Sequence, residues 1–119
     1  MIVLVCGSRD YTNRLLITER LCALQDDGYD TLIEGEARGA DTIAKLAGEA
    51  LGMQIMPFPA DWDKYGKRAG YIRNQQMLDE GHPDLVVAFY SRPVKSRGTQ
   101  MMVDIARKAG VPVVEYAEH

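Results

Sequence analysis

The chain has 119 residues, of which 46% are apolar and 26% are charged, and its formal net charge is -3 at pH 7. This length fits one domain with one core, and the composition is that of a folded globular protein rather than a disordered or fibrous chain. The acidic charge argues against broad binding to nucleic acid, which needs a basic face.

The chain opens on a short apolar run, Ile2 to Cys6, that predicts a buried strand. No signal-peptide pattern precedes it and no apolar run is long enough to cross a membrane, so we expect a cytoplasmic protein without a membrane partner. Cys6 and Cys22 are interpreted as small core residues of a reduced protein. The two histidines, His82 and His119, offer no zinc-site spacing, and we expect neither a metal nor another cofactor.

Strands and helices are predicted to alternate along the whole chain. The strand-sized runs are residues 2–6, 31–34, 53–56, 85–89 and 111–115. Apolar side chains at helical spacing predict four helices, around residues 17–24, 43–51, 72–78 and 102–109. This order predicts a single α/β domain of three layers over residues 1–119, in which a five-stranded parallel sheet of order 3-2-1-4-5 carries helices on both faces. Ligands bind such sheets where the strand order reverses, here between the first and fourth strands.

The loop after the first strand is Gly7-Ser8-Arg9-Asp10. It supplies a glycine, a hydroxyl group and a guanidinium group at that reversal point. Ser8 either belongs to a ligand site or forms a turn. Arg9 beside Arg38 would be costly through charge repulsion unless an anion or a carboxylate lies between them, and Asp10 could supply that carboxylate.

The segment from Gly35 to Asp41 joins the second strand to an alanine-rich helix and indicates an anion-binding corner. Two glycines, of which Gly39 is the second, let the backbone bend and approach a ligand closely. The helix that begins near Gly39 and Ala40 presents unpaired N–H groups, and Arg38 adds a planar donor for phosphate. Asp41 either caps this helix, the commoner role of aspartate there, or accepts hydrogen bonds from sugar hydroxyls.

Two later segments lie near the same edge of the predicted sheet. The connection over residues 58–70 is longer than a minimal loop, and its Trp62 and Tyr65 either stack on a base or cover the edge of the core. Arg73, which Asn74 follows, either holds a phosphate or pairs with an aspartate of that connection. In the loop over residues 91–99, Gly98-Thr99 opens a helix after several basic residues. That start is either a phosphate site or a capped helix with solvated basic residues.

Familiar catalytic signals are missing from this sequence. It contains neither a Walker sequence nor a Gly-x-Ser-x-Gly elbow, which argues against ATP hydrolysis and serine esterase chemistry. Glu34 at the end of the second strand is placed like a ribose-binding acid, but the first loop lacks the further glycines of the dinucleotide fingerprint.

Taken together, these segments resemble the YspA/YpsA-related proteins of the SLOG superfamily over nearly the whole chain. The Gly-x-Ala-Arg-Gly-Ala-Asp portion is the most specific, and the others are Gly7-Ser8-Arg9-Asp10, the Asp61-Trp62 loop, Arg73-Asn74-x-x-Met77 and Gly98-Thr99. The resemblance implies a Rossmann-like fold, a pocket for nucleotides or nucleotide-derived ligands, and a bacterial or phage origin. The superfamily includes the LOG nucleotide phosphoribohydrolases and the DprA DNA-binding proteins.

The resemblance to LOG enzymes fails at one decisive position. Met102 stands where their motif has a glutamate that takes part in cleaving the N-glycosidic bond, although Arg73 resembles the LOG arginine. A methionine cannot accept a proton or stabilise an oxocarbenium charge, so LOG-like hydrolysis would require another carboxylate, with Glu36, Asp41 and Asp10 as candidates.

We therefore expect a homo-oligomeric sensor or sponge that binds an ADP-ribose-like molecule, a nucleoside monophosphate or a signalling nucleotide. The alternative is a nucleotide N-glycosidase or phosphoribohydrolase with Glu36, Asp41 and Arg73 as catalytic candidates. Single-stranded DNA binding, as in DprA, is a further alternative that the acidic charge disfavours. The expected ligand-binding residues are Gly7, Ser8, Arg9, Gly35, Arg38, Gly39, Ala40, Asp41, Trp62, Arg73, Asn74, Gly98 and Thr99.

Overall fold

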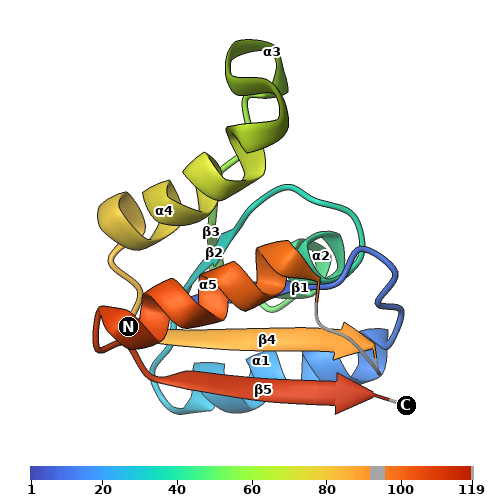
Figure 1. Ribbon diagram of the computed structural model, residues 1–119. Helices are drawn as coiled ribbons and strands as arrows, with labels where there is room; N and C mark the ends of the chain where they lie inside the picture. The colour runs from blue at the N-terminus through green and yellow to red at the C-terminus, as the bar shows by residue number, and fades with distance from the viewer. Residues whose placement is uncertain (92–95, 119) are drawn as a thin grey trace.

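The computed structural model describes residues 1–91 and 96–118, so residues 92–95 of the loop predicted over residues 91–99 lie outside the described part, as does His119. Five parallel strands form one sheet of order β3-β2-β1-β4-β5, which confirms the predicted fold class (Figure 1). The strands are β1 (Ile2–Gly7), β2 (Thr31–Glu34), β3 (Gln54–Pro57), β4 (Leu85–Ser91) and β5 (Val113–Glu118). The main helices are α1 (Arg14–Asp26), α2 (Ala40–Ala50), α4 (Ala69–Gly81) and α5 (Arg97–Lys108).

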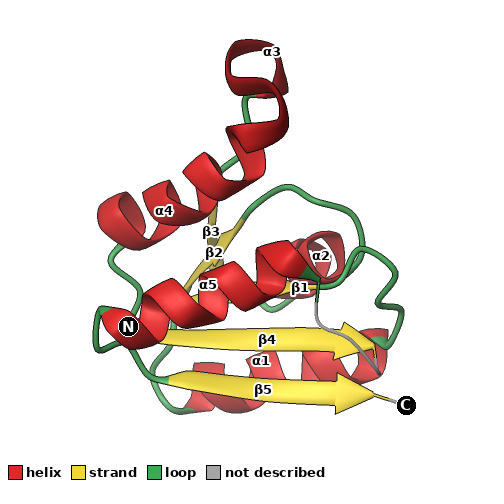
Figure 2. Ribbon diagram, viewed as in Figure 1, coloured by secondary structure: helices red, strands yellow, loops and turns green. Residues whose placement is uncertain are grey.

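Helices cover both faces of the sheet, as the three-layer prediction requires (Figure 2). Because successive strand residues point to opposite faces, Leu32 packs with α1 and α2 whereas Ile33 packs with α4 and α5. The central strands β1 and β4 pair in register, with Val5 opposite Val87 and Gly7 opposite Phe89. Their carboxyl ends therefore meet at one edge of the sheet.

The long connection over residues 58–70 contains helical structure where the sequence suggests a loop. A short helix, α3 (Trp62–Tyr65), and a 3-10 turn, η1 (Gly66–Arg68), precede α4 and project from the body of the molecule (Figure 1). Asp61 starts this helix, because its Oδ1 accepts a hydrogen bond from the Lys64 N–H at 3.1 Å. No residue of α3 or η1 is buried.

The expectation for the two cysteines is half correct. Cys6 is buried on β1, but Cys22 is exposed. Leu21 is buried against the sheet, as is Ile17 one turn earlier in α1. Cys22 follows Leu21 directly and is rotated by about 100° around a helix of 3.6 residues per turn, so it points away from the core. In residues 1–91 and 96–118, no helix is long and apolar enough to span a lipid bilayer.

Candidate ligand-binding site

A cleft of about 510 Å³ lies at the carboxyl ends of β1 and β4, where the strand order reverses. This is the place that the sheet topology predicts for a ligand. Its walls come from the loop after β1, the loop before α2, the first turns of α4 and the start of α5. The lining residues are Cys6, Gly7, Ser8, Arg9, Asp10, Ala37, Asp41, Arg73, Asn74, Met77, Ser91, Ser96, Gly98 and Thr99.

Ser8 forms hydrogen bonds with β4, with the loop after β1 and with the start of α2, all of which border this cleft. Its N–H donates to the Phe89 carbonyl at 3.0 Å, and its Oγ accepts from the Ser91 N–H at 3.2 Å. Its carbonyl accepts from the N–H groups of Tyr11 at 3.3 Å and Ala40 at 3.2 Å. The turn predicted for Ser8 is therefore present, and its hydroxyl group connects β1 to the end of β4.

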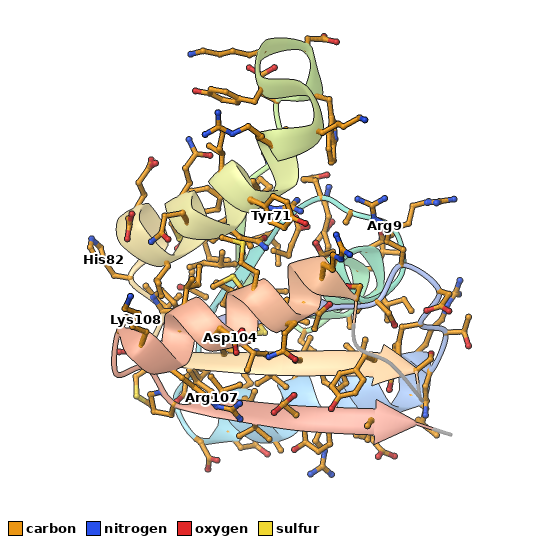
Figure 3. The ribbon with its side chains drawn as sticks, viewed as in Figure 1. Arg9, Tyr71, His82, Asp104, Arg107 and Lys108 are labelled. Atoms are coloured by element: carbon orange, nitrogen blue, oxygen red, sulfur yellow. The ribbon has the colours of Figure 1, made fainter. Side chains whose placement is uncertain are left out.

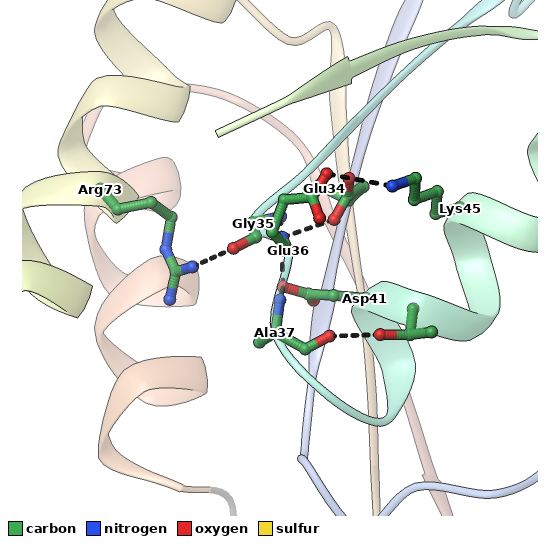
Figure 4. A network of polar contacts seen from close by, with 8 residues as sticks. Glu34, Gly35, Glu36, Ala37, Asp41, Lys45 and Arg73 are labelled. Atoms are coloured by element: carbon green, nitrogen blue, oxygen red, sulfur yellow. Dashed lines mark hydrogen bonds and ion pairs between the residues drawn. The ribbon is translucent and has the colours of Figure 1, made fainter. Parts of the chain in front are cut away.

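Asp41 holds the loop before α2 closed. Its Oδ2 accepts hydrogen bonds from the N–H groups of Gly35 at 3.2 Å and Ala37 at 3.3 Å (Figure 4). The helix itself has Gly39 as its N-cap residue, without a side-chain cap. The prediction that Asp41 caps this helix is thus wrong, because its carboxylate binds N–H groups of the preceding loop instead of those of the helix. Burial raises the pKa of Asp41 to about 6, against the opposing effects of the Arg73 charge and these two hydrogen bonds.

The two glycines of this loop serve contacts within the protein. Gly39 has φ 73°, and a Cβ there would overlap the Ser8 carbonyl oxygen and lie 2.6 Å from the Arg9 carbonyl carbon. A Cβ on Gly35 would lie 2.9 Å from Cζ of Arg73. The close approach that the two glycines predict for a ligand is therefore made by protein groups, which occupy the space beside both residues.

Arg73 and Asn74 join the three walls of the cleft. The Arg73 Nη1 donates to the Gly35 carbonyl, and its Nε donates to the Asn74 Oδ1 at 3.0 Å. The Asn74 Nδ2 in turn donates to the Gly98 carbonyl at the start of α5, at 3.1 Å. Burial lowers the pKa of Arg73, and the nearby Asp41 charge opposes that shift. α4 therefore positions a guanidinium group inside the cleft while holding both neighbouring loops.

The start of α5 is a capped helix that opens onto the cleft. The Ser96 Oγ accepts from the Thr99 N–H at 3.2 Å and donates to the Thr99 Oγ1 at 2.9 Å. This is the cap that the sequence allows for Gly98-Thr99. A Cβ on Gly98 would meet nothing within 4 Å, and Gly98 lines the cleft. The cap therefore leaves the Gly98 side of this helix start accessible to a ligand.

A second hollow of about 420 Å³ adjoins the main cleft, between residues 35–38 and residues 59–62. Arg9 and Arg73 line both spaces, whereas Arg38 and Trp62 line only the second. The Arg9 Cζ lies 6.0 Å from the centroid of the Trp62 ring. Arg9 and Arg38 thus border the same hollow, but Arg38 does not line the main cleft at the start of α5. Ala40 lies in the core with 0% exposure.

The candidate acids differ in their access to the main cleft. Asp10 and Asp41 line it, whereas Glu36 lines the second hollow and pairs with Lys45 at 3.2 Å. Met102 is fully buried between α5 and the sheet. The position where LOG enzymes carry a glutamate therefore faces the core in this protein.

Glu34, which the sequence places like a ribose-binding acid, lines neither the main cleft nor the second hollow, and its role near the site is not revealed by the sequence. It is fully buried below the loop before α2, and its Oε2 accepts a hydrogen bond from the Glu36 N–H at 2.5 Å (Figure 4). Among the described residues, its Oε1 has no hydrogen-bond partner. Burial raises the pKa of Glu34 to about 7, and the charges of Glu36 and Asp41 act in the same direction. The only sequence signal is an acid at the end of a buried strand.

Residues 1–65 match the family described as YspA, cpYpsA-related SLOG family, a stretch that contains the loop after β1 and the loop before α2. The chain belongs to this SLOG family. It is also similar to Gene 61 protein of Mycobacterium phage D29, with 35% identity over 124 residues that cover 98% of this chain and 96% of that protein. No solved structure matches the chain significantly. Membership of the SLOG family is consistent with nucleotide-related binding or with glycosidase activity, and the phage relative fits a phage or bacterial origin.

Proposed function

We propose that this SLOG protein binds a nucleotide-derived ligand in the main cleft and acts as a sensor or sponge for it. The supporting observation is that two guanidinium groups, an accessible helix start and one buried carboxylate line the same cleft at the switch point of the sheet. Guanidinium groups and helix starts are donors for phosphate, and a carboxylate is an acceptor for sugar hydroxyls. Nucleotide derivatives carry both kinds of group.

The parts of the cleft suggest a role for each residue. Arg9 is exposed at the mouth and Arg73 is held deeper by Gly35, so both can donate to phosphate oxygens. Asp41, with a pKa of about 6, is mostly ionised at pH 7 and can accept from ribose hydroxyls. Gly98 lets the ligand approach the backbone at the start of α5.

We expect the substitution Arg9→Ala to weaken ligand binding about tenfold, which corresponds to one charge-assisted hydrogen bond of about 1.5 kcal/mol. Arg9 is exposed, so this substitution should leave the fold intact. Lys108→Ala is the matched control, because it removes one positive charge at the opposite end of the molecule (Figure 3).

The measurement is a thermal-shift screen with nucleoside monophosphates, ADP-ribose, cyclic nucleotides and a short oligonucleotide, followed by calorimetry with the best ligand. The proposal predicts that Arg9→Ala, but not Lys108→Ala, lowers the affinity. It would be refuted by a protein that neither binds nor is stabilised by any member of the panel. Mass spectrometry of small molecules that co-purify with the native protein identifies the ligand independently.

A second candidate function is hydrolysis of an N-glycosidic bond, and one observation favours it. Asp41 lines the cleft with a pKa raised to about 6, close to the value that suits a general acid or base near neutral pH. In this case the purified protein should release free base from a nucleotide, and Asp41→Asn should abolish the release while circular dichroism shows an unchanged fold. Recovery of intact ligand after long incubation would favour binding alone.

We also propose that the protein acts in the cytoplasm as a homo-oligomer. Light scattering of the purified protein measures the mass of the particle in solution, to be compared with 13.3 kDa for one chain. A mass of one chain at micromolar concentration would contradict the proposed assembly.

A further inference from the structure

The second hollow and the main cleft form two compartments that meet at Arg9 and Arg73. Their volumes are about 420 and 510 Å³, and each lies within the range of small-molecule sites, about 300–1,000 Å³. The main cleft lies against the start of α5, whereas the second hollow lies against the segment before α4. A ligand with one compact part would fill only one of these spaces, whereas a ligand with two parts would fill both.

The second hollow carries an accessible cation and an accessible aromatic ring. Arg38 is exposed, and Trp62 keeps 50% of its surface accessible. The Arg9 Cζ is 6.0 Å from the Trp62 ring centroid, at the outer limit of a cation–π contact. The carboxylate of Glu36 also borders this hollow, but it is paired with Lys45. An indole beside guanidinium groups suits a planar base or a sugar face that carries a phosphate.

The positive charges of Arg9 and Arg73 lie near each other where the two compartments join. Burial lowers the pKa of Arg73, the Asp41 charge opposes this shift, and the charge of Arg9 lowers the pKa further. One oxygen of Asp41 is already engaged by the N–H groups of Gly35 and Ala37. An anion placed between the two guanidinium groups would relieve their repulsion, and phosphate accepts hydrogen bonds from both.

On the basis of the proposed function, we infer that the ligand has two nucleoside or sugar groups joined through phosphate, as in a dinucleotide or a nucleoside diphosphate sugar. The linking phosphate lies between Arg9 and Arg73. One half enters the main cleft beside Asp41, and the other half lies on Trp62 next to Arg38.

The chain offers a direct probe of this arrangement, because Trp62 is its one tryptophan. The experiment compares AMP and ADP, which have one nucleoside, with ADP-ribose and diadenosine diphosphate, which have two such groups. A parallel guanine series uses GMP and diguanosine diphosphate. We expect the two-part ligands to quench Trp62 fluorescence and to bind at least about tenfold more tightly in calorimetry, because the second half adds charge-assisted hydrogen bonds. The one-part ligands should bind with little change in fluorescence.

A pair of matched variants tests the assignment of the second hollow. Arg38→Ala should reduce the preference for two-part over one-part ligands about tenfold. Arg68→Ala removes the same charge from the exposed turn η1, which borders neither compartment, and should leave that preference unchanged.

Each outcome of this comparison decides a separate claim. Equal affinities and equal fluorescence changes for both classes would overturn the two-part ligand while leaving the proposed function in place. A preference that Arg38→Ala does not reduce would overturn the assignment of the second half to this hollow. If neither class binds, the proposed function fails and this inference fails with it.

Discussion

Replacement of Gly7 by alanine should destabilise the protein by about 3 kcal/mol or more, because overpacking at a site that cannot relax is among the most costly changes in a core. A Cβ at this position would overlap the Phe89 carbonyl oxygen and lie 2.7 Å from the Ala40 Cβ. The obstacles are the backbone of β4 and the first residue of α2, neither of which can rotate away as a flexible side chain can. Urea denaturation followed by circular dichroism measures the effect.

The same substitution at Gly98 provides the control. A Cβ there would meet nothing within 4 Å, and Gly98 lies in the first turn of α5. Since alanine is the better helix former, we expect Gly98→Ala to be neutral or to stabilise the protein by up to about 1 kcal/mol. Equal losses of stability for the two variants would show that the close contact at Gly7 does not exist in solution.

The stability of the protein should fall as the pH rises from about 4.5 to 8, and Glu34 should be a main cause. The ordinary pKa of 4.5 for this side chain is raised to about 7 in the folded protein. Between these values the folded state keeps a proton that the unfolded chain has released, so the free energy of unfolding decreases with pH. The shift corresponds to a loss of about 3 kcal/mol by pH 8. Asp41, with its pKa raised to about 6, acts in the same direction.

The substitution Glu34→Gln should remove most of this dependence. The amide oxygen can still accept from the Glu36 N–H, and the amide nitrogen takes the place of the oxygen that has no partner among the described residues. We therefore expect the variant to match the original protein near pH 4.5 and to exceed its stability by about 2–3 kcal/mol at pH 8. Urea denaturation at both pH values tests this, with Glu80→Gln on the exposed side of α4 as the control. An unchanged slope in Glu34→Gln would assign the pH dependence to other groups.

Much of the fold follows from local patterns in the sequence. The apolar runs that became β1 and β4 are nearly continuous, as both faces of a central parallel strand must be buried. Right-handed crossovers and helices on both faces are compatible with the strand order 3-2-1-4-5, the order that the structure has. The fifth strand starts at Val113 rather than Val111, because the Val111 N–H closes the end of α5 by bonding to Ala106 and Pro112 has no N–H.

The candidate site was predictable in place but not in its internal contacts. The carboxyl ends of β1 and β4 had to converge, so the loops around Ser8 and Asp41 and the start of α5 were expected to meet. Asp41 accepts hydrogen bonds from the N–H groups of Gly35 and Ala37. These bonds depend on the path of the loop before α2, which no local sequence pattern specifies. The same holds for Trp62, which lies in the short helix α3 with its ring centroid 6.0 Å from the Arg9 Cζ.

The amino-acid sequence by itself determined the α/β class, the strand order, the family and the edge of the sheet where a ligand is expected, because periodicity, turn residues and a specific motif are local properties of the chain. Only the tertiary structure decided which groups face each other. It buried Glu34 without a partner for one oxygen among the described residues, and it directed Met102 away from the cleft. It also placed Arg9 and Arg73 where the two compartments meet and Arg38 in the second hollow alone. Burial and the distance between charges arise from segments far apart in the chain, and these two quantities set the pKa values and the binding chemistry of the site.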